Sequence, residues 1–182
     1  MNETLTEALN IVLSALSIFA IVFSLIIIFV FTIKETRNKF IFNIKNLIND
    51  YHILLAWTIA SLASIGSLFY SEISGFVPCT YCWYERIAMY PLVIILGVGI
   101  YLKSKDSWLY ALPLSIIGLL ITIYHYQLQM FPNQNSLSCS TEVSCTGTWI
   151  KEFGFVTMPF MALSTFFLIS VLLLIPNINN KK

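Results

Sequence analysis

Two cysteines in a Cys-x-x-Cys arrangement, Cys79 and Cys82, are the residues of this sequence best suited to chemistry. They lie between two long apolar segments and follow Pro78, which cannot continue a helix from upstream but suits the first turn of a new one. If that helix begins near Cys82, its unpaired N–H groups and its dipole stabilise a thiolate there. Arg86 follows one helical turn later on the same face. A reactive sulfur beside a fixed cation indicates redox chemistry.

A second cysteine pair, Cys139 and Cys145, lies in a polar segment further along the chain. A disulfide within either pair would close only a short loop and would stabilise the fold little, which favours exchangeable redox pairs over structural crosslinks. A zinc site made of all four thiolates is the metal alternative. We expect no metal, because Cys-x5-Cys is looser than common zinc spacings and no nearby His completes such a pattern.

The composition places these cysteines in a membrane protein. Hydrophobic residues make up 58% of the chain, charged residues only 10%, and the mean hydropathy of +0.81 is far above that of soluble globular domains. The net charge of +1 gives no reason to expect a nucleic acid as partner. Five segments are apolar over a length that crosses a bilayer, and no strand-like alternation or internal repeat competes with them. They are residues 9–33, 52–70, 86–102, 108–130 and 156–175.

The basic residues predict how this all-α bundle is oriented. Eight of them lie at one end of the spans, whereas only Arg86 and Lys151 lie at the other. The positive-inside rule then places the N-terminus outside and the C-terminus inside, as five spans require. All four cysteines fall on the extracytoplasmic side, where disulfides persist. The eight residues are Lys34, Arg37, Lys39, Lys45, Lys103, Lys105, Lys181 and Lys182.

The segment between the first two spans has a helical pattern of its own. Apolar residues from Phe40 to Tyr51 recur at helical spacing, with basic and Asn residues between them. This predicts a basic amphipathic helix on the cytoplasmic face of the membrane. A loop that continues into the second span is the alternative.

Arg86 and His125 each admit two interpretations. Arg86 could reach the lipid headgroups or pair with Glu85, whereas its position one turn beyond Cys82 favours holding a ligand oxygen or a developing anion. His125 lies late in the fourth span, at the cysteine end. It could be a structural residue bonded to Gln129 one turn away, or a functional one.

Four segments, in order along the chain, resemble the DsbB family of thiol–disulfide quinone oxidoreductases, and most closely its short BdbC-like members. They are residues 78–86 (PCTYCWYER), residues 123–129 (IYHYQLQ), the Cys139-x5-Cys145 pair, and Phe153-Gly154-Phe155 with Met158-Pro159. A lone Cys-x-x-Cys is weak evidence, whereas this combination is specific. The resemblance implies a four-helix redox domain over residues 52–182. Residues 1–51 add an extra transmembrane helix and the cytoplasmic amphipathic helix.

The resemblance also implies a function. A family member in the bacterial cell membrane reoxidises an extracytoplasmic thioredoxin-like dithiol oxidase of the DsbA or BdbD type and passes two electrons to menaquinone or ubiquinone. The implied disulfides are Cys79–Cys82 and Cys139–Cys145. The partner attacks Cys139, Cys145 passes the electrons to Cys79, and Cys82 becomes the thiolate that faces the quinone. Arg86 and His125 are then expected beside the quinone.

Two other functions are weighed against this one. Enzymes of the vitamin K epoxide reductase type share a similar bundle, but their loop cysteines precede the Cys-x-x-Cys, whereas here they follow it. A non-catalytic membrane scaffold or transporter subunit with structural disulfides is the alternative from another class. Such a protein would bind no quinone and would tolerate mild reductant.

Overall fold

Five α-helices account for most of the chain. The computed structural model describes residues 2–32, 39–104, 106–134, 139 and 144–180. Its helices are α1 (Asn2–Thr32), α2 (Lys39–Leu68), α3 (Thr80–Tyr101), α4 (Ser107–Met130) and α5 (Met158–Asn180), with a π-helical turn η1 (Phe69–Ile73) after α2. All five α-helices contain a segment long and apolar enough to cross a membrane. Among these residues there is no β-strand, only an isolated bridge between Glu152 and Val156. The expected all-α membrane fold is confirmed.

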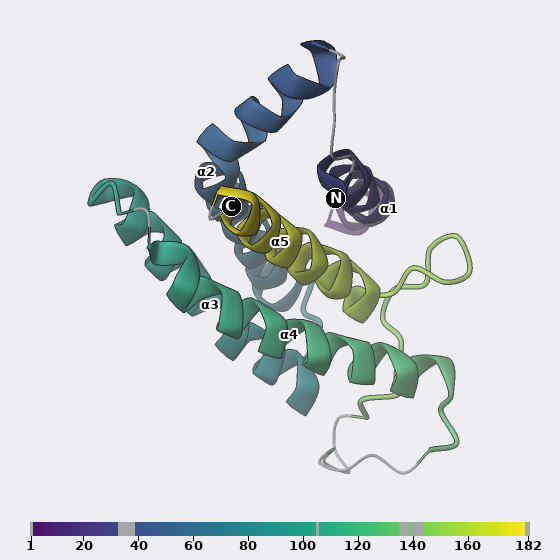
Figure 1. The fold of residues 1–182 in the computed structure, drawn as a ribbon. Helices are drawn as coiled ribbons and strands as arrows, with labels where there is room; N and C mark the ends of the chain where they lie inside the picture. The colour runs from purple at the N-terminus through teal and green to yellow at the C-terminus, as the bar shows by residue number, and fades with distance from the viewer. Residues whose placement is uncertain (1, 33–38, 105, 135–138, 140–143, 181–182) are drawn as a thin grey trace.

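Helix α5 is the centre of the bundle. It packs against α1, α2 and α4, while α3 packs against α2 and α4. In Figure 1 the yellow α5 lies between α1 and α4. Phe166 and Leu172 of α5 are fully buried, and Gly118 of α4 lets the two helices approach because a Cβ there would overlap the Phe166 ring. Helices α2 to α5 thus form a four-helix bundle to which α1 is added.

Two side-chain hydrogen bonds tie the beginning of α1 to the turn η1 that follows α2. Thr6 Oγ1 lies 3.2 Å from Ser74 Oγ, and the Tyr70 hydroxyl donates to Asn10 Oδ1 over 2.9 Å. The beginning of α1 therefore lies at the end of the bundle where α2 leads into α3 through the cysteine motif. Which side of the membrane this end faces stays a prediction. Several basic residues behind that prediction lie outside the described residues: Lys34, Arg37, Lys105, Lys181 and Lys182.

Two expected helix boundaries were wrong. The segment from Phe40 to Tyr51 is helical, but it belongs to the same continuous helix as the second span, because no Pro or Gly interrupts the chain there. Its location on a membrane surface stays a prediction. Helix α3 begins at Thr80, two residues before the expected helix start near Cys82 and six before the expected apolar span at Arg86, so Cys82 lies in its first turn and not in a loop. Hydropathy does not detect this start, because the residues from Thr80 to Glu85 are mostly polar or aromatic.

Candidate active site

Cys79 is the N-cap residue of α3. Its backbone is extended (φ −76°, ψ 174°), and its Sγ accepts a hydrogen bond from the Cys82 N–H over 3.3 Å. The chain reaches this cap through a turn at Gly75, whose φ of +71° favours glycine, and then through Pro78. From the sequence, the helix start is expected to stabilise the thiolate of Cys82. That was wrong, because a helix that begins at Thr80 directs its free N–H groups toward Cys79.

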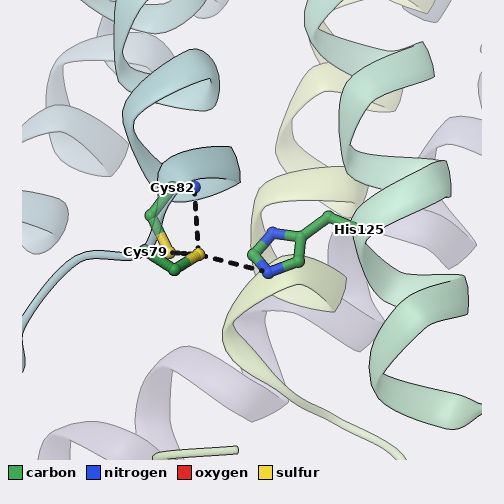
Figure 2. Close-up of side chains that lie close together, drawn as sticks. All are labelled: Cys79, Cys82 and His125. Atoms are coloured by element: carbon green, nitrogen blue, oxygen red, sulfur yellow. Dashed lines mark hydrogen bonds between the residues drawn. The ribbon is translucent and has the colours of Figure 1, made fainter. Parts of the chain in front are cut away.

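The thiols of Cys79 and Cys82 lie beside a buried histidine. Their sulfurs are 2.6 Å apart, and His125 Nε2 lies 3.5 Å from Cys79 Sγ (Figure 2). No bond joins the two sulfurs in this structure, and the expected Cys79–Cys82 disulfide stays a prediction. The two sulfurs need only a small approach to form that bond, because an S–S bond is about 2.05 Å long.

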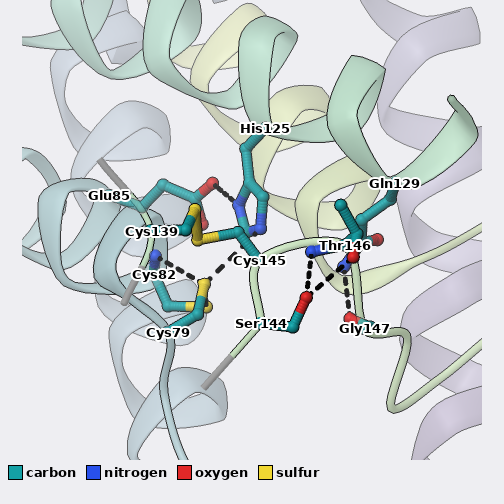
Figure 3. Close-up of a disulfide and its surroundings, with 10 residues drawn as sticks. All are labelled: Cys79, Cys82, Glu85, His125, Gln129, Cys139, Ser144, Cys145, Thr146 and Gly147. Carbon is teal, nitrogen blue, oxygen red and sulfur yellow. Dashed lines mark hydrogen bonds and ion pairs between the residues drawn. A yellow bond between two sulfur atoms is a disulfide. The ribbon is translucent and has the colours of Figure 1, made fainter. Parts of the chain in front are cut away.

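Glu85 completes this cluster from the next turn of α3. Its carboxylate Oε1 lies 2.7 Å from His125 Nδ1, and this contact leaves Nε2 directed at Cys79 (Figure 3). The sequence-based prediction gave Glu85 no role beyond a possible pairing with Arg86. The signal it missed is an acidic residue one turn after a cysteine within an apolar helix, where a charge needs a partner. The suggested bond from His125 to Gln129 was wrong, since Gln129 Nε2 donates to the Gly147 carbonyl over 2.9 Å.

These donors favour the thiolate form of Cys79. The hydrogen bond from the Cys82 thiol makes the largest contribution, and the His125 ring and the Cys82 N–H add to it. Together they outweigh burial, which opposes a charge, and lower the pKa of the Cys79 thiol to about 4. The surroundings of reduced Cys79 therefore favour its thiolate over its neutral thiol.

The pH dependence of alkylation at Cys79 tests this assignment. Since the thiolate is the reactive form, labelling of reduced Cys79 by iodoacetamide should be nearly constant from about pH 6 to about pH 8. An ordinary thiol would become about tenfold more reactive per pH unit over the same range. Because the folded pKa lies below the unfolded one, the thiolate stabilises the reduced protein at alkaline pH, and this stabilisation declines as the pH falls toward about 4.

Peptide mapping by mass spectrometry would follow Cys79 separately from Cys82. The variant His125→Gln is the matched comparison, because it removes the imidazole next to the sulfur while keeping a polar side chain. Its labelling midpoint should move upward. A midpoint near pH 8 or above in the unaltered protein, the value of an ordinary cysteine, would contradict the assignment.

The second cysteine pair meets the first at this end of the bundle. Cys139 and Cys145 form a disulfide, and Cys145 is buried in one cluster with Cys79, Tyr81 and Leu128. Cys139 is only partly buried and packs against the same cluster. Figure 3 shows the disulfide beside Cys79 and Cys82, with the loop held to α4 at Gly147. Two sequence-distant pairs thus lie within one packed group.

The same cluster bears on the metal alternative. The ligand atoms of Cys79, Cys82 and His125 lie within 4.8 Å of one another, close enough for a metal ion. A four-thiolate zinc site is not formed, because Cys139 and Cys145 are joined in a disulfide. Three ligands are one fewer than structural zinc sites use. The expected absence of a metal stays a prediction.

A cavity of about 420 Å³ lies on the other side of Cys82. Helix α3 contributes Cys82, Glu85 and Arg86 to its wall, and most of the remaining wall is apolar and comes from α1, α2 and α5. Neither Cys79 nor His125 is among the lining residues. Of the residues expected beside a quinone, Cys82 and Arg86 therefore border this cavity, whereas His125 contacts Cys79.

Arg86 is fixed in the cavity wall by contacts with α2 and with its own helix. Its Nε donates to Ser67 Oγ over 3.0 Å, its Nη2 donates to the Ser67 carbonyl over 2.9 Å, and its guanidinium lies 5.3 Å from the centroid of the Trp83 ring. The alternative pairing with Glu85 does not hold, since Glu85 bonds to His125. The cation is thus held at one position beside Cys82.

The loop after α4 is built on aromatic contacts and a tight turn. The Trp149 ring stacks on Phe76 with centroids 5.0 Å apart, and Phe76 in turn stacks on Tyr70. Reciprocal backbone hydrogen bonds of 2.9 Å between Glu152 and Val156 close a turn around Phe153-Gly154-Phe155. These contacts hold the segment beyond Cys145 against the beginning of α3.

Comparisons with known proteins identify the family of this chain. The family model "Disulfide bond formation protein DsbB" matches residues 50–175. "Probable disulfide formation protein C 2" of Bacillus anthracis is 44% identical over 136 residues, which are 75% of this chain and 97% of the relative. "Disulfide bond formation protein C" of Bacillus subtilis is 45% identical over 117 residues, which are 64% of this chain and 85% of the relative. No solved structure matches the chain significantly.

The matched region holds both cysteine pairs and the helices that bring them together. In a chain with five helices able to span a membrane, this makes the redox cluster part of a membrane protein. The chain therefore belongs to the DsbB family of disulfide bond formation proteins and is a disulfide-forming membrane oxidoreductase.

Proposed function

We propose that the protein oxidises an extracytoplasmic thioredoxin-like dithiol oxidase and passes the two electrons to a membrane quinone. The observation that supports this most is the packing of Cys145 against Cys79, while Cys82 borders the apolar cavity. One cysteine pair lies in a loop that a soluble protein can reach, and the other borders a space suited to a lipid-soluble oxidant. The buried cluster that contains Cys79 and Cys145 brings the two cysteine pairs into contact.

The cycle begins at the loop disulfide. Cys139 is partly exposed, whereas Cys145 is only 1% exposed, so a partner thiolate reaches Cys139 more easily. A bond forms between the partner's sulfur and Cys139, the Cys139–Cys145 bond breaks, and Cys145 leaves as a thiolate.

Cys145 then attacks Cys79 of an oxidised Cys79–Cys82 pair, and Cys82 leaves as a thiolate. The partner's second thiol cleaves the mixed disulfide, so the partner departs oxidised and Cys139 is released. Cys139 next attacks Cys145, which restores the loop disulfide and releases Cys79. The low pKa of Cys79 makes it a good leaving group in this step. Two electrons from the partner now reside on Cys79 and Cys82 as thiols or thiolates.

Glu85 and His125 can balance the negative charge of the Cys79 thiolate. Glu85 fixes the imidazole through Nδ1, so that Nε2 faces Cys79 Sγ at 3.5 Å. His125 can therefore hold a proton beside the sulfur whenever Cys79 is a thiolate, and release it when the sulfur becomes part of a disulfide.

The cavity fits a quinone. Its volume lies at the lower end of the range of about 300–1,000 Å³ found for ligand pockets, and its mostly apolar wall suits a ring with a hydrocarbon tail. The hydroxyl of Tyr90, which also lines the cavity, is buried and has no hydrogen-bond partner among the described residues. It is a donor for a ring oxygen one helical turn beyond Arg86. A bound quinone would supply a two-electron, two-proton oxidant that returns Cys79 and Cys82 to a disulfide.

A trapping experiment tests the proposed exchange. The probe is the thioredoxin-like oxidase of the same organism, reduced, with its resolving cysteine replaced so that it cannot complete the exchange. It should become linked to the full-length oxidised protein through Cys139, as mapped by mass spectrometry of the cross-linked peptides. The variant Cys139→Ser is the control and should not be linked. Linkage to Cys145, or an intact loop disulfide in the presence of the probe, would contradict the proposal and favour structural disulfides.

A further inference from the structure

Helix α1 lies outside the region that the family model matches, yet it forms part of the cavity wall. The match covers residues 50–175, whereas α1 spans Asn2–Thr32. Six residues of α1 line the cavity beside Cys82 and Arg86, at helical spacing on one face. They are Leu13, Leu16, Ser17, Phe19, Ala20 and Phe23.

The wall that α1 supplies is apolar. Its only polar member, Ser17, donates its hydroxyl to the Ser14 carbonyl over 2.7 Å and so offers no free donor to a ligand. The charged side chains of the cavity wall, Glu85 and Arg86, lie on α3 instead, together with the Cys82 thiol. A ligand with a polar ring and a hydrocarbon tail would therefore place its ring toward α3 and its tail along α1.

The cavity opens to the outside of the bundle between α1 and α2. Helix α1 packs closely along α5 but makes few contacts with α2 (Figure 1). Leu16 and Phe19 of α1 and Leu62 of α2 line the cavity and are nevertheless 55%, 63% and 69% exposed. All three lie within helical segments that can span the membrane, so this exposed surface faces lipid.

We propose that this seam between α1 and α2, bordered by Leu16, Phe19 and Leu62, is a lateral portal for the prenyl tail of the quinone. This inference rests on the proposed function. The quinone ring lies beside Cys82 and Arg86, and its tail passes between the two helices into the lipid. Helix α1, which lies outside the family match, thereby sets how fast tailed quinones bind and leave.

The test compares two quinones on the full-length protein in lipid nanodiscs: one with a polyprenyl tail and one with the same ring and no tail. Association is followed in stopped flow by quenching of tryptophan fluorescence, since Trp149 lines the cavity. The double variant Leu16→Phe/Leu62→Phe narrows the seam. We expect it to slow association of the tailed quinone about tenfold and to change the tailless quinone less than about twofold.

The matched control is Leu25→Phe/Leu68→Phe, which makes the same substitutions at exposed positions that do not line the cavity. It should leave both quinones unaffected. A second variant, Phe19→Ala, widens the seam and should speed dissociation of the tailed quinone several-fold. Its control is Phe29→Ala, which is 67% exposed and lies away from the cavity. The second variant keeps the test decisive if the first does not fold.

The outcomes separate this inference from the function on which it rests. Equal slowing of both quinones by the narrowing variant, or no effect on the tailed one, would overturn the portal while leaving quinone binding intact. Failure of the unaltered protein to bind either quinone would overturn the proposed function itself.

Discussion

Replacement of Cys82 by Ser should stop the enzyme after it has oxidised a single equivalent of its partner. The loop disulfide Cys139–Cys145 is still present in this variant and can accept one pair of electrons. Cys79 then has no disulfide partner, so Cys145 cannot pass the electrons on. Of the two cysteines of the motif, it is Cys82 that borders the cavity. We expect quinone reduction to fall to the uncatalysed rate.

The measurement is the number of partner disulfides formed per protein, followed over time with excess reduced partner and quinone. Cys82→Ser should give one, whereas the unaltered protein should continue for many turnovers. The variant Thr80→Ser is the control, because it changes a neighbouring residue in the same turn of α3 and leaves both thiols in place. Continued quinone reduction by Cys82→Ser beyond the first equivalent would refute the roles assigned to the two cysteines.

Replacement of Arg86 by Met should lower kcat/KM for quinone by a factor of about 10² to 10³, the usual effect of removing one fixed donor from a site of developing negative charge. Met keeps most of the apolar length of the side chain and removes the charge. Arg86→Lys should lose less, because it keeps the charge but gives up the paired hydrogen bonds to Ser67. Direct quinone binding and steady-state kinetics at saturating partner would measure both variants.

A purely structural role for Arg86 predicts a different pattern. Loss of packing would slow the exchange between partner and loop disulfide as well, and would lower the melting temperature in parallel. The variant Ser67→Ala removes one acceptor of the guanidinium without touching its charge, and should have a small effect on either measurement. If Arg86→Met slowed the first partner exchange as much as quinone reduction, the cation would not be acting at the quinone step.

Much of this architecture could be predicted from the sequence, because it depends on composition and length. Five apolar segments predict five spanning helices. The two cysteine pairs lie in the second and fourth connections between these segments, and alternate connections fall at the same end of the bundle. The hydrogen-bond partner of His125 could not be predicted in this way. Glu85 lies 40 residues away on another helix, and only the rotation and packing of α3 against α4 bring the two side chains within 2.7 Å.

The assignment of the stabilised thiolate depended on a still finer detail. Whether α3 begins at Thr80 or near Cys82 decides which sulfur receives the N–H groups of its first turn. Hydropathy does not locate that boundary, since helix ends are set by capping contacts of single residues. The packing of α1 along α5, and with it the cavity wall, likewise follows from side-chain contacts that no periodicity in the sequence encodes.

The most direct test of the account is coupled turnover with purified components. The full-length protein in lipid is mixed, without oxygen, with reduced thioredoxin-like oxidase and a tailed quinone, and both products are quantified. We expect one hydroquinone for each partner disulfide, sustained over many turnovers and dependent on all four cysteines. Partner oxidation that stops at the protein's own disulfides while the quinone stays oxidised would contradict the account.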